Sequence, residues 1–394
     1  MRPRSRIFSD RVRDAHSRMD YTLFRMFKNP AMINPEAVKK ILCVEFLYLG
    51  DLIVTTPAVR ALRETFPNAE ITFLLPKGMR EVFEHNPNVE HIIDIDPKEL
   101  SKRRINQLSM SLRSMNFDIG VLFYPGNKRV SKLLKKSRIP IRVGCAKTGF
   151  FEGKGKYLTH KVRPTKEKKN YVEENLDVVR TIGSDTLNTN LELYTSADLN
   201  IFFNKNNIGE KDLVIVVHPG PANPTHKWMN LRFSAVIDAL IEKHNAKVIL
   251  TGTRKDENDI LEIESTTKNK VVTAIGMNLN QYFKIIQRAD LVISVDTGAM
   301  HVSAAFNCPT LSLFGAGDPK VWRPHTNNIK VLYYPTMCTG CMRYQCRFKG
   351  EREMECMRAI SVEDVIVASE ELLNLETQKK DIKTAISATQ EILP

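Results

Sequence analysis

Short apolar runs that alternate with helical stretches constrain the fold of this 394-residue chain more than any other feature. Strands that are apolar throughout are typical of a parallel sheet with helices on both faces. In the first half the pattern predicts a helix over 57–66 and strands over 41–46, 71–75, 92–95, 119–123 and 139–143. The first half therefore reads as a doubly wound α/β domain.

The same alternation restarts after a polar, Asn-rich region at 188–207. It predicts a helix over 231–244 and strands over 213–217, 247–250, 271–274, 291–295 and 310–314. Ser361 and Asp364 form the pattern of a capping box, which opens a further helix that ends near residue 375. A chain of this length exceeds one ordinary core, so we expect two Rossmann-like domains in tandem, facing across a cleft that holds the chemistry.

The expected boundaries follow from these patterns. They are a basic N-terminal extension at 1–38, an acceptor-binding domain at 39–195, a nucleotide-sugar-binding domain at 205–375 with a cysteine-rich loop at 338–356, and a tail at 376–394.

Composition narrows the class of protein further. With 42% hydrophobic and 26% charged residues, the chain resembles soluble globular proteins. No apolar run approaches the roughly 20 residues that span a bilayer, and no export signal opens the sequence. We expect a cytoplasmic protein, with a peripheral position at the inner face of the inner membrane as an open alternative.

The net charge of +13 is concentrated in two segments. Residues 128–169 hold 15 Lys and Arg against two acidic residues, and residues 1–38 interleave arginines with aromatic side chains. Such concentration favours a polyanionic partner, such as nucleic acid, a phosphorylated glycolipid or an anionic membrane, over a solvated loop. The N-terminal segment fits either a helix on a membrane surface or one packed on the protein.

The first segment with candidate catalytic residues is Leu49–Pro57, which follows the first expected strand and contains Gly50 and Asp51. Glycine allows a sharp turn there, and the Asp51 carboxylate can accept a proton from an attacking hydroxyl. Alternatively, Asp51 caps the following helix.

The second segment is His218–Trp228, after the first strand of the second domain. Pro219 and Gly220 give an irregular backbone whose N–H groups could face an anion, and Lys227 adds a positive charge. The alternative is a plain loop with an exposed lysine, because the spacing of a Walker A loop is absent.

The third segment is Leu291–His301, in which an expected strand ends at Val295 and a helix begins near Gly298. The free N–H groups at Thr297 and Gly298 lie at the positive end of the helix dipole, which predicts a phosphate site. Asp296 suits hydrogen bonds to sugar hydroxyls. The alternative is a capped helix in which His301 is satisfied locally.

Four of the seven cysteines fall within nineteen residues, at Cys338, Cys341, Cys346 and Cys356. Four thiolates suit a structural zinc or iron site, with no open coordination position. Reduced thiols and a disulfide pair are the alternatives. The other three, Cys43, Cys145 and Cys308, have apolar or small neighbours and read as buried thiols.

Together these segments resemble glycosyltransferase family 9, the lipopolysaccharide heptosyltransferases. The resemblance rests on L-G-D-x-x-x-x-T-P at 49–57, H-P-G followed by K-W at 218–228, and D-T-G-x-x-H at 296–301 before C-P-T-L-x-L-F-G. It spans about residues 40–373, and the cysteine spacing C-x2-C-x4-C-x9-C also occurs in part of the family.

The resemblance implies a GT-B fold, an ADP-heptose donor, a Kdo-lipid A type acceptor and inversion at the anomeric carbon. It assigns Asp51 as general base and Lys227 as the contact to the donor diphosphate. Asp296 matches the donor-sugar contact, and Gly220, Thr297, Gly298 and His301 fall in the donor-binding segments. Lys227 and the helix start supply positive potential to the departing diphosphate, so no metal cofactor is required for catalysis.

The chain departs from the family at Glu45, where many members carry a basic residue, and this leaves the acceptor open. One alternative is a related GT-B transferase that uses another nucleotide sugar for a different polysaccharide or a protein. A nucleic-acid-binding protein is disfavoured, because residues 128–169 hold few aromatic side chains and no recognised RNA or DNA motif.

Overall fold

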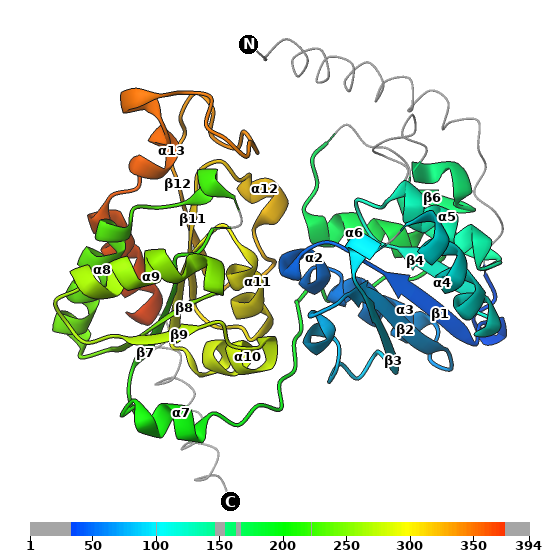
Figure 1. The fold of residues 1–394 in the computed structure, drawn as a ribbon, viewed down its shortest axis with the longest axis horizontal. Helices are drawn as coiled ribbons and strands as arrows, with labels where there is room; N and C mark the ends of the chain where they lie inside the picture. Colours follow the sequence, from blue (N-terminus) through cyan, green and yellow to red (C-terminus); the bar gives the residue numbers. More distant parts are fainter. Residues whose placement is uncertain (1–32, 100, 146–153, 163–166, 222, 375–394) are drawn as a thin grey trace, which may run out of the picture. The chain divides into compact units, whose positions relative to one another are not determined.

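The computed structural model describes residues 33–99, 101–145, 154–162, 167–221 and 223–374. Two compact units, Met1–Thr189 and Asn190–Pro394, make up the chain (Figure 1). The expected tail at 376–394 and all but the last residues of the expected extension at 1–38 lie outside the described residues.

The N-terminal unit contains a six-stranded, fully parallel sheet in the order β3-β2-β1-β4-β5-β6. Its strands are β1 (Lys40–Val44), β2 (Glu70–Pro76), β3 (His91–Ile95), β4 (Ile119–Leu122), β5 (Ile141–Cys145) and β6 (His160–Val162). Its helices are η1 (Pro35–Ala37), α2 (Leu49–Ile53), α3 (Thr56–Thr65), η2 (Arg80–Val82), η3 (Pro97–Glu99), α4 (Lys102–Ser114), α5 (Lys128–Lys136), η4 (Lys154–Tyr157) and α6 (Tyr171–Arg180).

The C-terminal unit repeats this plan with a parallel sheet in the order β12-β11-β10-β7-β8-β9. Its strands are β7 (Val214–His218), β8 (Lys247–Gly252), β9 (Val272–Ile275), β10 (Leu291–Val295), β11 (Thr310–Phe314) and β12 (Ile329–Tyr333). Its helices are α7 (Asn200–Lys205), η5 (Pro224–His226), α8 (Asn230–His244), η6 (Arg254–Asp256), α9 (Glu257–Thr266), α10 (Leu279–Arg288), α11 (Gly298–Ala305), α12 (Pro319–Trp322), η7 (Gly350–Arg352), α13 (Glu355–Arg358) and a last helix over 362–374.

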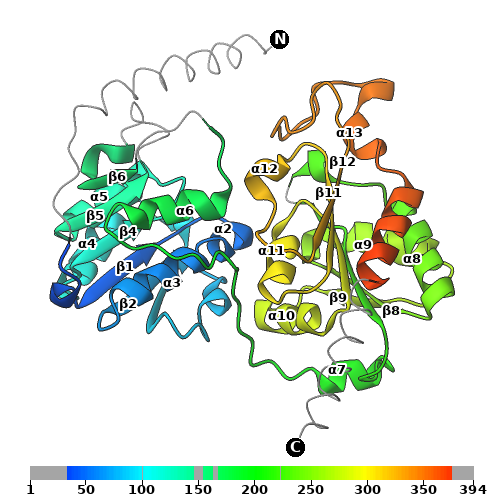
Figure 2. The same ribbon diagram turned by 180° about the vertical axis from the view of Figure 1, so that it is seen from behind.

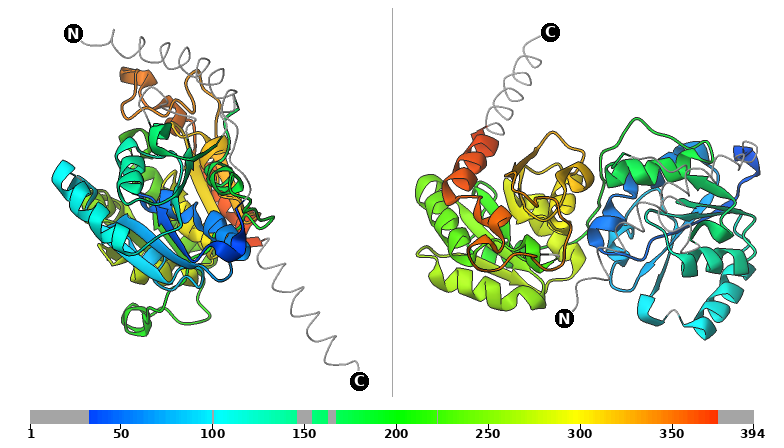
Figure 3. Two further views of the ribbon diagram at one scale, coloured as in Figure 1. Left: turned by 90° about the vertical axis from the view of Figure 1, so that its right-hand side faces the viewer. Right: turned by 90° about the horizontal axis from the view of Figure 1, so that it is seen from above.

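Helices cover both faces of each sheet. In the C-terminal unit α8 and α9 pack together on one face, and α10 and α11 on the other (Figures 1 and 2). In the N-terminal unit α3 packs with α6, and α4 packs with α5 (Figure 3). Because both faces are covered, strands such as β10 and β11 are buried at every residue, as their apolar sequences require.

In both sheets the strand order reverses once, between β1 and β4 and between β7 and β10. Successive strands are added on one side of the first strand until the chain crosses to its other side. At such a switch point the loops that follow the two neighbouring strands diverge and leave a crevice at their carboxyl ends. Each unit therefore has one preferred position for a ligand.

The predicted strands lie within about two residues of the observed ones, and the predicted α/β class is confirmed. Two short strands, β6 and β12, were not predicted, because a partly buried edge strand has no continuous apolar run. The turn expected at Gly50–Asp51 is instead the short helix α2. Cys43, Cys145 and Cys308 are buried thiols, as expected.

Within the described part of the chain, no helix combines the length and apolar character needed to cross a bilayer.

Candidate functional site

The second and third sequence segments meet at the switch point of the C-terminal unit. Strands β7 and β10 are hydrogen-bonded neighbours, with His218 in register with Ser294. The loop that carries Gly220 therefore leaves the sheet beside the loop that carries Asp296. The imidazole Nδ1 of His226, at the end of η5, lies 3.1 Å from the backbone oxygen of Asp296 and holds the two loops together.

Asp296 is the carboxylate whose position in this crevice is fixed by burial and by contact with His226. Its side chain is buried, and burial raises its pKa to about 6, although the nearby His226 opposes the rise. The distance from His226 Nδ1 to Asp296 Oδ2 is 3.3 Å. The carboxylate is thus held at the end of β10, where it can accept hydrogen bonds from sugar hydroxyls.

Gly317 explains how Asp296 fits there. A Cβ atom added to Gly317 would lie only 1.6 Å from Asp296 Oδ2, so the carboxylate occupies the space that any side chain would need. Sequence reasoning missed Gly317 and His226. The available signal was the pair of glycines after β11, Gly315 and Gly317. Closely spaced glycines often mark a place where another group lies close against the backbone.

The start of α11 provides the expected anion site. Thr297 is its N-cap residue in extended conformation, and its side chain makes no capping hydrogen bond. The N–H groups of the first helical turn at Gly298 are therefore available to an anion at the positive end of the helix dipole.

His301 lies one turn further along α11 and is buried. Burial lowers its pKa to about 3, so the imidazole is neutral at pH 7. Its ring meets the Trp322 ring edge-on, with centroids 6.2 Å apart. Nδ1 of His301 has no hydrogen-bond partner among the described residues. A buried ring nitrogen without a partner favours a hydrogen bond to a ligand over the alternative considered above, in which His301 is hydrogen-bonded within the protein.

Gly220 and Lys227 lie on the β7 side of the crevice. A Cβ atom on Gly220 would lie 2.6 Å from the carboxylate carbon of Asp256, so any larger residue would displace that side chain. Lys227 Nζ lies 2.5 Å from Asp259 Oδ1 on α9 and is 40% exposed. Its ammonium group is therefore positioned by Asp259, and its remaining N–H groups can contact a diphosphate.

Asp51 lies in the N-terminal unit, on α2 after β1. It accepts a hydrogen bond from the Tyr48 backbone N–H at 3.2 Å, so it does stabilise the start of the helix. It is also buried, and burial raises its pKa to about 6. Capping and catalysis are compatible, because one oxygen serves the helix and the carboxylate remains a base above pH 6.

Glu45 directly follows β1, and the sequence alone marked it only as a departure from the family. Its Oε1 accepts the N–H groups of Phe46 and Leu47 at 2.7 and 3.0 Å. Burial and the charge of Asp51 raise its pKa well above the usual value, and Oε2 has no hydrogen-bond partner among the described residues. Burial therefore favours the protonated form of both neighbouring carboxyl groups, Glu45 and Asp51.

Two tyrosines complete this region. Tyr124, just after β4, and Tyr171, at the start of α6, contact edge to face with ring centroids 5.0 Å apart. Burial and, next, the charge of Asp51 raise the pKa of Tyr171. The Tyr124 N–H donates to Asn175 Oδ1 at 3.0 Å. The switch point of the N-terminal unit therefore contains the buried Asp51 carboxylate and the aromatic rings of Tyr124 and Tyr171.

The cysteine loop forms part of the C-terminal unit's crevice. Gly340 and Met342 donate backbone hydrogen bonds to Gly315 and Ala316 at 3.0 and 2.8 Å, directly before Gly317. Burial and, to a smaller extent, the charges of the other three cysteines raise the pKa of Cys356 to about 11. All four are reduced, and no group of three or more metal-ligating side chains in the described ranges has the geometry of a metal site.

The structure thus brings together Gly220, Asp296, Thr297, Gly298 and His301 at one crevice, with Lys227 at its edge. Asp51 belongs to the other unit, at the matching position of its sheet.

Comparisons with known proteins agree with this architecture. The family model for glycosyltransferase family 9 (heptosyltransferase) matches residues 105–351. Lipopolysaccharide heptosyltransferase 3 of Escherichia coli K12 is 28% identical over 347 residues, 85% of this chain and 98% of that protein.

Solved structures share the fold. The glycosyl transferase family 9 structure from Veillonella parvula aligns with a TM-score of 0.73 at 26% identity and covers 85% of this chain and 97% of that one. Escherichia coli ADP-heptose LPS heptosyltransferase II aligns with a TM-score of 0.72 at 22% identity and covers 86% and 99%. The two Rossmann-like units are those of a GT-B fold, as expected.

Proposed function

Because this chain belongs to glycosyltransferase family 9, the heptosyltransferase family, we propose that it transfers heptose from ADP-heptose to the lipopolysaccharide inner core, with inversion at the anomeric carbon. The observation that carries the proposal is the crevice at β7 and β10. There a helix start, a buried carboxylate and two glycines in close contact with aspartate side chains meet at the switch point. The acceptor is a Kdo-lipid A type glycolipid, reached from the inner face of the membrane.

The proposed reaction is a single displacement. An acceptor hydroxyl oxygen bonds to the anomeric carbon while the bond from that carbon to the diphosphate breaks, and ADP leaves with the electron pair. Asp51 takes the hydroxyl proton. The first-turn N–H groups at Thr297 and Gly298, with Lys227, stabilise the charge that develops on the diphosphate. Attack from the face opposite the leaving group inverts the anomeric carbon.

Binding of the donor should involve exchange of ion pairs. In the free protein Lys227 is held by Asp259. A diphosphate, with its higher charge, competes for the ammonium group, while Asp296 and the neutral His301 lie at the strand end and on α11, where sugar hydroxyls can meet them.

The assignment of the base is tested with Asp51→Asn. We expect this variant to fold, to bind the donor as the wild type does, and to lose most of its transfer activity, with kcat reduced about 100-fold or more. ADP release in the presence of donor and acceptor measures the activity. Full activity of Asp51→Asn would remove Asp51 from the mechanism.

The donor is tested by thermal shift with a panel of nucleotide sugars, because a ligand that binds the folded state raises its melting temperature. We expect ADP-heptose to raise Tm more than UDP-sugars do. A preference for a UDP-sugar would instead favour a related transferase that acts on another polysaccharide or a protein.

For the cysteine loop we propose a structural metal, zinc or iron, bound by Cys338, Cys341, Cys346 and Cys356. Four thiols within nineteen residues, the ligand number of a closed tetrahedral site, support it, although among the described residues no three metal-ligating side chains lie in metal-binding geometry. Elemental analysis of purified protein tests it, since one metal per chain is expected in the wild type and none after Cys341→Ser/Cys346→Ser. Because the loop contacts Gly315 and Ala316, metal removal should also weaken donor binding. A wild type that contains no metal would leave the thiols reduced and inert.

A further inference from the structure

Residues 337–349, which include most of the cysteine loop, carry exposed side chains that the proposed reaction does not use. The segment follows β12 and projects from the C-terminal unit, where Figures 1 and 2 draw it in orange. Three of the twelve exposed large apolar side chains of the described residues lie here within eight residues. They are Met337, Met342 and Tyr344, which are 76%, 49% and 63% exposed. Exposed apolar side chains that gather in one place mark an interaction surface.

Positive charges accompany these apolar side chains. Residues 337–349 contain Arg343, Arg347 and Lys349 and no acidic residue. Arg343 and Arg347 are exposed, and neither forms an ion pair with another described residue. Lys349 Nζ lies 2.7 Å from Glu353 Oε1, but the lysine side chain is 82% exposed. The surface formed by 337–349 is therefore both apolar and basic, and we call it the amphipathic loop.

The remaining aromatic side chain of the loop is held by cations. The guanidinium carbons of Arg347 and Arg352 lie 4.6 and 4.0 Å from the ring centroid of Phe348, the distance of a cation–π contact. Phe348 thus fixes two of the charged side chains. Tyr344 is the other aromatic residue of the segment. Proteins that bind single-stranded nucleic acid stack several bases on aromatic side chains, so this loop is poorly suited to that partner.

The backbone of the loop is fixed to the C-terminal unit. The Met342 N–H donates to the Ala316 carbonyl at 2.8 Å, and the Thr225 hydroxyl donates to the Arg343 carbonyl at 2.5 Å. Both bonds use main-chain atoms of the loop, while the side chains of Met342 and Arg343 are exposed. A loop whose backbone is already fixed loses less conformational entropy when its side chains bind a partner.

We propose that the amphipathic loop docks on the surface of an anionic phospholipid bilayer. The methionines and Tyr344 enter the headgroup region, where an apolar body with a polar tip is favoured. The cations Arg343, Arg347 and Lys349 lie along the lipid phosphates, with which their charge is complementary. This contact goes beyond the proposed reaction, because none of these side chains is assigned to the donor, the acceptor or the base.

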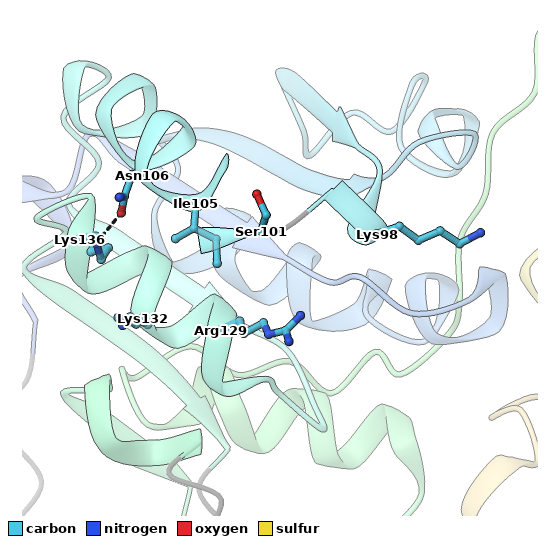
Figure 4. A pocket seen from close by; sticks show the side chains of 7 residues that line it. All are labelled: Lys98, Ser101, Ile105, Asn106, Arg129, Lys132 and Lys136. Atoms are coloured by element: carbon cyan, nitrogen blue, oxygen red, sulfur yellow. Dashed lines mark hydrogen bonds between the residues drawn. The ribbon is translucent and has the colours of Figure 1, made fainter. Parts of the chain in front are cut away.

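A second cluster of cations lacks the apolar half of this combination. A cavity of about 350 Å³ in the N-terminal unit is lined by four cations, two polar residues and Ile105 (Figure 4). Ile105, the apolar member, is buried. Cations without exposed apolar side chains offer nothing that inserts into a bilayer, so the loop and not this cavity is the surface that fits it. The lining residues of the cavity are Lys98, Ser101, Ile105, Asn106, Arg129, Lys132 and Lys136.

The test places a tryptophan in the loop as a reporter of insertion. In Tyr344→Trp we expect tryptophan emission to shift to the blue, and brominated lipid to quench it, when phosphatidylglycerol vesicles are added. Phosphatidylcholine vesicles should cause neither change. The wild type, with Trp228 and Trp322, gives the background signal. The matched control is Leu231→Trp, at a 64% exposed position on α8, which should show no change with either lipid.

Further variants in the Tyr344→Trp protein separate charge from apolar contact. Arg343→Gln/Arg347→Gln should weaken the affinity for phosphatidylglycerol vesicles at least tenfold, because two cations leave the surface. Met337→Ser should weaken it severalfold, because apolar area is lost from the contact. Lys205→Gln/Lys211→Gln removes the same charge from exposed positions outside the loop and should leave the affinity unchanged. Cooperative thermal unfolding checks that each variant is folded.

Three results would overturn the proposal. One is an unchanged Tyr344→Trp emission on anionic vesicles, even if the protein sediments with them, because another basic segment would then make the contact. Another is an equal loss of affinity in Lys205→Gln/Lys211→Gln and Arg343→Gln/Arg347→Gln, since overall charge would explain it. The third is an emission shift on single-stranded RNA but not on vesicles. These assays contain no donor and no acceptor, so their outcome is independent of the proposed function.

Discussion

Asp51 and Asp296, the two carboxylates of the proposed mechanism, are held in positions that lower the stability of the fold at neutral pH. Both carboxylates are buried at the carboxyl end of a sheet, and burial raises each pKa to about 6. The folded protein therefore prefers the neutral form of both carboxyl groups, whereas the proposed roles require the ionised form. A buried charge that is kept for its reactivity is a common property of active sites.

This conflict predicts a pH-dependent effect of Asp51→Asn on stability. The raised pKa means that the wild type is fully stable below about pH 4 with respect to this group, and that this stability is lost as the pH rises through 6. At pH 7.5 Asp51→Asn should therefore raise the free energy of unfolding by roughly 1–3 kcal/mol. Near pH 4 the difference should vanish.

Urea unfolding at both pH values measures this effect. The substitution Asp94→Asn, at an exposed aspartate on β3, is the control and should change stability little at either pH. A variant that is less stable than the wild type at pH 7.5 would show that the Asp51 charge is better compensated than its burial suggests.

Gly317→Ala tests the packing of Asp296. The new Cβ atom would overlap Asp296 Oδ2, so the carboxylate must leave its position. We expect a loss of about 1–3 kcal/mol in stability and a donor affinity at least tenfold weaker, by thermal shift and titration calorimetry. Gly209→Ala is the control, because its Cβ atom would make only an ordinary contact of 3.6 Å. Unchanged donor binding in Gly317→Ala would contradict a role for Asp296.

At the scale of single residues, the sequence predicted site residues that directly follow a strand. It did not predict residues whose role depends on a contact with a different loop. Asp51, Asp296 and Thr297 follow apolar runs and were predicted for that reason. His226 and Gly317 were missed, because each acquires its role only from contact with Asp296, from a different loop. Such contacts depend on strand order, which no local pattern contains.

The elements themselves were largely predictable, since buried parallel strands leave a continuous apolar signal. The exceptions β6 and β12 are edge strands, and α2 is a single short helix stabilised by Asp51 after a glycine. The last helix, over 362–374, was predicted from its capping box. Ser361 Oγ accepts the Asp364 N–H at 3.0 Å, and Asp364 accepts the Ser361 N–H at 3.0 Å.

Ser361→Ala should therefore destabilise the C-terminal unit by about 1 kcal/mol. The helix contributes Val365, Ala368, Leu372 and Leu373 to the core, so fraying at its start is transmitted to the sheet. Urea unfolding measures the loss, and Ser361→Thr, which keeps the hydroxyl, should retain most of the stability. Equal losses in the two variants would show that packing at Ser361, and not capping, is responsible.

For the whole molecule, each unit has its own sheet and hydrophobic core. A fragment of residues 190–394 should therefore fold alone and bind ADP, because every predicted donor residue belongs to it. Cooperative thermal unfolding and calorimetric titration with ADP measure this. The fragment should release no ADP from a donor and acceptor, since it lacks Asp51. A fragment that fails to unfold cooperatively would show that the second core depends on the first unit.

The uniform strand direction has a practical consequence for engineering. Since all twelve strands are parallel within their sheets, the segments that return from a helix to the next strand lie at the edge away from the reactive groups. The short connections at 66–69 and 245–246 are of this kind. A fluorophore or an affinity handle placed there should leave the catalytic rate equal to that of the unlabelled enzyme.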